Sequence, residues 1–150
     1  MELSLGAKVP LEDLYQSKIL EFARIARKTN LLDNSTVRFT LKNPICGDEV
    51  TIDLSINKNY KITNYGHNVK GCALCEASAG LLSNNIIGIN AKKASKINED
   101  LISWLKSEKD EFIFSGLKNF FPVRDFQNRH RCVSLSFDAF SQACNKYLEG

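Results

Sequence analysis

The sequence lacks the features that would assign it to nucleic-acid binding or to a membrane. Its 20 Lys and Arg residues are spread along the chain, whereas nucleic-acid binders usually gather them in a basic stripe. Its apolar runs are only a few residues long, far short of the roughly 20 residues needed to cross a bilayer. Residues 1–5 have neither the basic start nor the long apolar stretch of a secretory signal. We therefore expect a cytoplasmic protein that binds neither nucleic acid nor membrane.

The sequence also lacks internal repeats and low-complexity linkers that would divide it into several domains. A length of 150 residues suits one domain with one core. The hydrophobic content of 43% is ordinary for such a domain. We expect residues 1–150 to form a single domain, with residues 1–10 as a candidate disordered tail.

The hydrophobic pattern changes along the chain from strands to helices. After a first helix, alternating apolar residues predict strands joined by turns, as in an antiparallel meander. The predicted strands cover residues 36–41, 50–56 and 60–67. Apolar residues at helical spacing predict helices over residues 11–28, 72–87, 93–106 and 136–148. This order predicts an α+β fold in which helices pack on one face of a small three-stranded antiparallel sheet.

Five cysteines are many for a chain of this size. Because the count is odd, the cysteines cannot all pair in internal disulfides. In a reducing compartment, clustered cysteines more often bind metal or take part in sulfur chemistry. The question is therefore which of them lie together in space.

Cys46 and Asp48 form a first candidate site, in a loop that contains Pro44 and Gly47. Residues two apart in a tight loop can converge on one ion, and a thiolate with a carboxylate suits Zn²⁺ or iron. A buried cysteine beside a turn-forming aspartate explains this loop equally well.

Cys72 and Cys75 form a second candidate, at the start of a predicted helix. Thiols at a helix N-terminus lie near the positive end of the helix dipole, which lowers their pKa. Metal binding and dithiol redox chemistry are both compatible with this spacing, although no thioredoxin-like strand–helix–strand unit precedes it. Two small residues that pack the helix onto the sheet are the structural alternative.

Cys132 follows a basic run, residues 129–131, and can complete a tetrahedral ligand set. Taken alone, a cysteine before an apolar run is more often part of the core. Cys144 lies at an apolar-spaced position of the last predicted helix, and we expect it in the core. The two histidines, His67 and His130, are each expected to be surface or structural residues.

Taken together, three ordered motifs resemble the U-type iron–sulfur scaffold family, which comprises IscU, SufU and the N-terminal domain of NifU. The motifs are residues 43–48 (NPICGD), 71–79 (GCALCEASA) and 131–135 (RCVSL). The resemblance covers roughly residues 14–147, nearly the whole chain. The long gap before Cys132 resembles the SufU or NifU-like branch.

The resemblance implies a ligand set of Cys46, Asp48, Cys72 and Cys132 for a nascent [2Fe–2S] cluster, or for Zn²⁺ as in the SufU branch. It implies a cysteine desulfurase and apo iron–sulfur acceptor proteins as partners. The chain would then be a scaffold without turnover or, alternatively, a zinc-dependent sulfurtransferase that activates the desulfurase.

By the same resemblance Cys132 would accept sulfur. Its basic neighbours should favour the thiolate. A segment that arrives from a long polar loop should also move more easily than the helix start that carries Cys72.

The sequence departs from the family pattern at three places. Arg131 stands where IscU proteins have a histidine, with His130 one position further back, which favours a SufU-like ligand set. Cys75 stands where most relatives have a small residue, and it adds a spare ligand, a sulfur relay or a disulfide partner for Cys72. Residues 26–30 lack the usual Pro-Arg-Asn segment, which concerns how a desulfurase would dock.

Two other classes of protein are compatible with these residues. A dithiol oxidoreductase would use Cys72 and Cys75 and need no metal. A zinc-stabilised interaction module would hold its metal permanently and transfer no sulfur.

Overall fold

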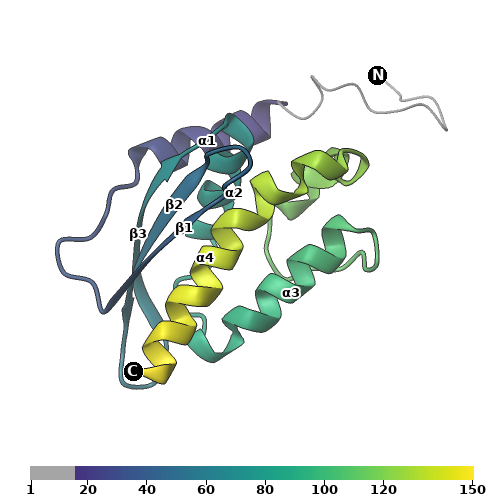
Figure 1. The fold of residues 1–150 in the computed structure, drawn as a ribbon. Coiled ribbons are helices and arrows are strands. Elements are labelled where there is room, and N and C mark those ends of the chain that lie inside the picture. The colour runs from purple at the N-terminus through teal and green to yellow at the C-terminus, as the bar shows by residue number, and fades with distance from the viewer. Residues whose placement is uncertain (1–15) are drawn as a thin grey trace.

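The computed structural model describes residues 16–150 of the chain. A three-stranded antiparallel sheet in the order β1-β2-β3 lies at its centre (Figure 1). The strands are β1 (Val37–Lys42), β2 (Glu49–Ile56) and β3 (Ile62–Lys70). The α-helices are α1 (Ser17–Lys28), α2 (Ala73–Ser83), α3 (Ala94–Leu105) and α4 (His130–Glu149), and the short 3₁₀ helices are η2 (Ala91–Lys93), η3 (Leu117–Asp125) and η4 (Gln127–Arg129). The predicted α+β class and the three-stranded antiparallel sheet are confirmed.

The strand register places apolar side chains in rows on one face of the sheet. Because side chains alternate between the faces of a strand, residues paired across the ladder share a face. The inner rows are Val37–Leu54–Tyr65, Phe39–Ile52–His67 and Leu41–Val50–Val69. The paired residues between these rows, such as Thr40 and Thr51, point to the outer face.

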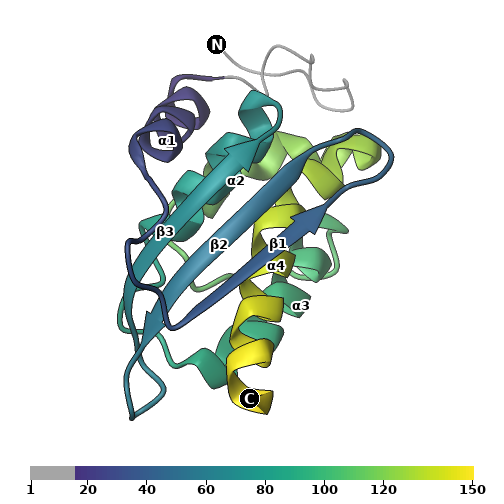
Figure 2. The same cartoon turned by 60° about the vertical axis from the view of Figure 1, so that its left-hand side comes forward.

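The helices cover the inner face only, as Figure 2 shows from the open side of the sheet. Helix α4 runs along β1 and β2, α2 lies against β3, and α3 packs on α4 (Figure 1). Helix α1 packs closely on α2, because a side chain at Gly80 would bring its Cβ within 2.1 Å of the Phe22 carbonyl oxygen. The core between these layers includes fully buried Phe120, Phe137 and Phe140.

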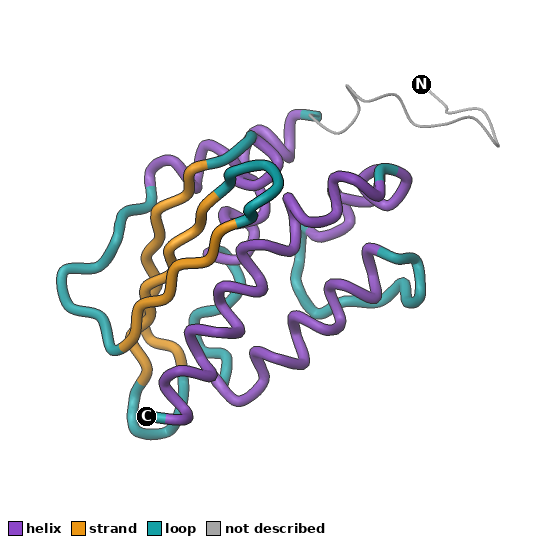
Figure 3. Tube along the Cα trace, viewed as in Figure 1, coloured by secondary structure: helices purple, strands orange, loops and turns teal. Residues whose placement is uncertain are grey.

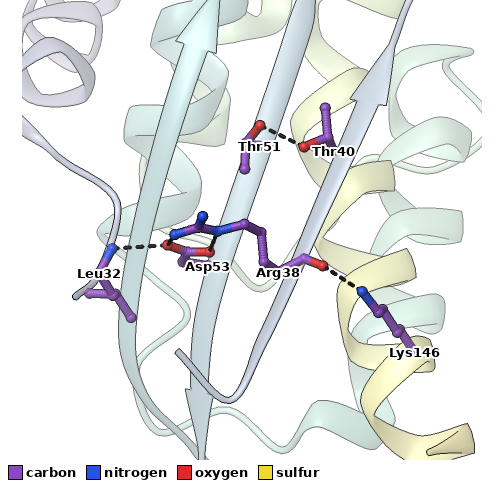
Figure 4. Close-up of polar contacts among 6 residues, drawn as sticks. All are labelled: Leu32, Arg38, Thr40, Thr51, Asp53 and Lys146. Carbon is purple, nitrogen blue, oxygen red and sulfur yellow. Dashed lines mark hydrogen bonds and ion pairs between the residues drawn. The ribbon is translucent and has the colours of Figure 1, made fainter. Parts of the chain in front are cut away.

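The outer face is polar and is crossed by the connection between α1 and β1, drawn in teal in Figure 3. Asp53 lies beneath this connection and is fully buried. Its carboxylate accepts two hydrogen bonds from the Arg38 guanidinium, at 2.6 and 2.8 Å, and one from the Leu32 N–H at 2.9 Å (Figure 4). Beyond Arg38, the Lys146 ammonium of α4 donates to the Arg38 carbonyl at 3.1 Å. One buried carboxylate thus fixes the connection to the sheet.

The third strand begins later than predicted because the turn before it is longer. The Asn57 side-chain oxygen accepts hydrogen bonds from the N–H groups of Asn59 and Lys61. Tyr60 adopts a positive φ of 65° within this turn, so the strand starts at Ile62 and runs on to Lys70.

The last helix begins six residues earlier than predicted, at His130. The prediction of a long polar loop before Cys132 is therefore wrong. Residues 117–125 and 127–129 form the 3₁₀ helices η3 and η4, and Phe120 and Val123 of η3 are buried in the core. The buried residues of η3 recur every third position, the period of a 3₁₀ helix, which neither an α-helical nor a strand pattern reveals.

Two further expectations concern the N-terminus and membranes. The first helix is described from Ser17; the predicted start at residue 11 and the candidate tail of residues 1–10 lie outside the described residues. Within residues 16–150, the helices do not combine the length and apolar character needed to cross a membrane.

We predict that Asp53→Ala lowers the free energy of unfolding by about 1–3 kcal/mol, because the part-buried Leu32 N–H loses its acceptor. Urea unfolding would measure it. Thr51→Val is the control on the same face, where only a hydrogen bond between two threonine hydroxyls is lost (Figure 4). Equal stability losses in the two variants would contradict the role of Asp53.

Candidate metal centre

Three of the four predicted ligands converge at one end of the sheet. One carboxylate oxygen of Asp48 and the sulfur atoms of Cys72 and Cys132 all lie within 4.8 Å of one another. In a tetrahedral site, zinc–sulfur bonds of about 2.3 Å place two sulfur atoms roughly 3.8 Å apart. The three donor atoms therefore need to approach one another by at most about 1 Å to share one ion. Two thiols and a carboxylate suit Zn²⁺ or iron.

Asp48 is positioned by the loop between β1 and β2. The Asn43 carbonyl accepts from the Gly47 N–H, and the Asn43 N–H donates to the Asp48 carbonyl, each at 2.8 Å. Gly47 has a φ of +80°, which glycine adopts without strain. Asp48 follows with its side chain only 8% exposed.

Gly71 leaves room for the Asp48 carboxylate beside the start of α2. A Cβ at this position would lie 3.0 Å from Asp48 Cγ and 3.1 Å from Cys75 Cβ. Gly71 is part of a sequence motif, but its spatial role could not be predicted, because the contact with Asp48 joins residues more than twenty positions apart.

Cys72 is the N-cap of α2 and is half-buried. Its pKa falls to about 6. The main cause is a hydrogen bond from the Cys132 thiol, and the N–H groups of Leu74 and Cys75 in the first helical turn add to it, while burial opposes it. Cys72 is thus a thiolate at neutral pH when no metal is bound, as its place at a helix start predicted.

Cys132 lies in the first turn of α4 and is 9% exposed. Its pKa is raised, first because its S–H donates to the Cys72 thiolate and then because it is buried. A hydrogen bond from Arg129 acts in the opposite direction but is weaker. The expectation that the basic run favours the Cys132 thiolate is therefore wrong when no metal is bound. Arg131, one member of that run, pairs instead with Asp138 at 3.0 Å.

Cys46 is the predicted ligand that the structure leaves out of the cluster. It is exposed in the loop between β1 and β2, next to Ile45, which is 95% exposed. The sequence placed it correctly in a tight loop but did not indicate which way the loop points.

The other cysteines and the histidines are structural. Cys75 is fully buried, and burial raises the pKa of its thiol, which argues against a reactive dithiol with Cys72. Cys144 is fully buried, as expected. His67 is buried between the Tyr65 hydroxyl and the Ala26 carbonyl, and a His130 ring nitrogen lies 3.2 Å from the Arg124 carbonyl oxygen.

Comparisons with known proteins find similar sequences over nearly the whole chain. A family model described as "NifU-like N terminal domain" matches residues 14–149. The iron–sulfur cluster assembly scaffold protein IscU of Thermotoga maritima is 28% identical over 136 residues, which cover 89% of this chain and 94% of that protein.

Solved structures share the fold. The N-terminal part of a nitrogen-fixing NifU-like protein from Brucella abortus has a TM-score of 0.82 at 30% identity, over 93% of this chain and 97% of that chain. A putative iron–sulfur cluster assembly scaffold protein for the SUF system, from Fervidobacterium islandicum AW-1, has a TM-score of 0.79 over 90% of this chain and 99% of that chain. At 22% identity, this second likeness shows the fold alone.

We predict that Cys132→Ala makes Cys72 less reactive at neutral pH. In chelator-treated wild-type protein, alkylation of Cys72 should decline as the pH falls through about 6. Without the Cys132 donor the pKa of Cys72 rises, and the midpoint moves to higher pH. Iodoacetamide labelling, quantified for each cysteine by mass spectrometry, measures this midpoint.

Two references make the labelling experiment specific. The exposed Cys46 reports reagent quality within each sample. Cys144→Ala makes the same substitution at a core position of α4 and should leave the midpoint in place. An unchanged midpoint in Cys132→Ala would contradict the hydrogen bond between the two thiols.

Proposed function

The chain belongs to the NifU-like N-terminal domain family, and we propose that it is an iron–sulfur cluster assembly scaffold. The observation that carries the proposal is the convergence of Asp48, Cys72 and Cys132 from three separate elements. Its cargo would be a metal ion or a nascent [2Fe–2S] cluster. We propose that residues 1–150 act as one scaffold domain.

We propose Cys46 as the fourth ligand. It is two residues from Asp48, in the loop that already contributes one donor to the cluster. The loop can bring Cys46 inward by rotating about Gly47, because a Cβ at Gly47 would meet no heavy atom within 4 Å. Binding of the metal ion or cluster would then hold Cys46 beside the other three ligands.

Asp48 would make the site able to release what it holds. Thiolates bind iron and zinc more strongly than a carboxylate does. A set of three thiolates and one carboxylate therefore has one exchangeable position. This suits a scaffold that hands its cluster to apo iron–sulfur proteins.

Sulfur would come from a cysteine desulfurase, with Cys132 as the proposed acceptor. Its thiolate would attack the terminal sulfur of the desulfurase persulfide, and the desulfurase cysteine would leave as a thiolate. The raised pKa of Cys132 without metal does not prevent this attack, because metal binding requires both Cys72 and Cys132 as thiolates. Arg129, which hydrogen-bonds Cys132, would then stabilise its negative charge.

The alternative roles use the same site differently. A zinc-dependent sulfurtransferase would keep Zn²⁺ bound and pass the Cys132 sulfur onward. A permanent zinc module would take up no sulfur. A dithiol oxidoreductase would need Cys75, which is fully buried with a raised pKa.

One experiment separates these roles. The purified protein is analysed for metal, then incubated with a cysteine desulfurase and cysteine, and bound sulfur is located by mass spectrometry. We expect Cys132→Ser to lose sulfur uptake and Cys75→Ser to keep it. Uptake at the normal rate by Cys132→Ser, with loss in Cys75→Ser or Cys72→Ser, would assign the acceptor to that residue instead.

We also predict that Asp48→Ala holds its cargo longer, because the exchangeable oxygen ligand is gone and a thiol or solvent takes its place. The measurement is the rate of cluster transfer to an apo-acceptor. Glu49→Ala is a suitable control, since the Glu49 side chain pairs with Lys42 outside the cluster. Faster transfer from Asp48→Ala than from wild type would refute the role of this carboxylate.

A further inference from the structure

Ser78 connects the two helices that carry the site thiols. It is fully buried in α2, and its hydroxyl donates a hydrogen bond of 2.5 Å to the main-chain carbonyl of Val133. Cys72 caps the same helix α2, and Val133 directly follows Cys132 in α4. The bond therefore runs from the helix of one thiol to the neighbour of the other.

We propose that Ser78 is a positioning residue that fixes the spacing of the Cys72 and Cys132 sulfur atoms. The effect of Ser78 on metal or cluster binding rests on the proposed scaffold function. Its effect on the distance between the two sulfur atoms does not depend on that function.

The rest of the packing cannot fix this spacing as well. The helices α2 and α4 pack beside each other, and both contribute apolar side chains and alanines to the core, including Leu74, Ala77, Val133 and Ala139. Apolar packing is not directional, so it defines the axial offset of the two helices less sharply than a hydrogen bond does. A buried hydrogen bond has a defined donor and acceptor and is stronger in a low-dielectric interior. Ser78 thus sets the axial position of α4 relative to α2.

The choice of acceptor supports a role between helices. A serine inside a helix commonly bonds the carbonyl four residues earlier, which here belongs to Leu74. Ser78 instead donates across to α4. The bond consequently contributes nothing within α2 and acts only between the two helices.

Ser136 provides a matched control. It is also a fully buried serine, it lies in α4, and its hydroxyl has no hydrogen-bond partner among the described residues. Ser136→Ala therefore makes the same chemical change in the same helix pair without removing a bond between the helices. Ser78→Thr keeps the hydroxyl and serves as the conservative variant.

The first measurement reports the thiol spacing without metal. In a Cys46→Ser background, chelator-treated proteins are equilibrated with oxidised and reduced glutathione. One oxidised glutathione converts the two thiols to a Cys72–Cys132 disulfide and yields two reduced glutathiones. Mass spectrometry gives the fraction of this disulfide, and hence the effective concentration of one thiol at the other. We expect a lower value in Ser78→Ala, an unchanged value in Ser136→Ala, and recovery in Ser78→Thr.

The second measurement reports the consequence for cargo. Titration of the Cys46-containing proteins with Co²⁺ follows the thiolate charge-transfer absorption. Mutation of residues that support metal ligands typically lowers metal affinity by about 10–100-fold. We therefore expect the dissociation constant for Co²⁺ to be at least roughly tenfold larger in Ser78→Ala than in wild type. Thermal unfolding confirms that each variant is folded at the temperature of titration.

The outcomes are distinct. A lower effective thiol concentration in Ser78→Ala alone supports the positioning role, even if no variant binds metal, in which case only the scaffold function fails. If wild type binds Co²⁺ and Ser78→Ala matches it in both measurements while merely melting at lower temperature, Ser78 is a stability residue and the positioning proposal is overturned. Equal losses in Ser78→Ala and Ser136→Ala overturn it as well.

Discussion

The packing of α2 and α4 on the inner face of the sheet is the constraint on which the site depends. Both helices begin at the end of the sheet where the loop between β1 and β2 lies (Figures 1 and 2). Cys72 and Cys132 stand at those helix starts, and Asp48 stands at the end of that loop. No single element contains the site, so its geometry is only as precise as the packing between the layers.

Three acidic groups in one buried corner present an electrostatic problem. Like charges at this separation repel one another, and burial disfavours the charged forms of the two thiols. The metal-free structure reduces the repulsion by leaving the proton on Cys132, which donates it in a hydrogen bond to the Cys72 thiolate. A bound cation would replace that proton and neutralise the remaining charge. The same crowding of acidic groups would therefore favour a bound cation.

Elements away from the site keep the layers in place. Gly80 lets α1 approach α2 closely, and Asp53 fixes the connection between α1 and β1 across the open face of the sheet (Figure 4). His67 joins β3 to the end of α1 through the Ala26 carbonyl. These contacts fix both α1 and the segment that connects it to the sheet. Helix α1 in turn packs against α2, the helix whose N-cap is Cys72.

The sequence by itself determined the elements and the chemistry. Alternation in residues 36–56 and helical spacing after Gly71 follow directly from the periods of strand and helix, so the three-stranded meander and the helical layer were predictable. The motifs around Cys46, Cys72 and Cys132 identified the family, and the place of Cys72 at a helix start predicted the direction in which its pKa moves, although the larger cause is the hydrogen bond from Cys132. These properties are local, and local spacing is what a sequence records.

Tertiary structure alone decided the remaining properties. The early start of α4 depends on Phe120 and Val123 reaching the core, which their three-residue 3₁₀ spacing concealed from a search for α-helical and strand periods. The acidities of the two site thiols depend on a hydrogen bond between residues 60 positions apart, and this bond keeps the proton on Cys132, whose basic neighbours predicted a thiolate. The direction of the Cys46 loop, the space left by Gly71 and the bond from Ser78 to Val133 likewise join distant segments. Hydrogen bonds and charge repulsion act between groups a few ångströms apart. Which groups lie that close is decided only when the sheet and the helices have packed together.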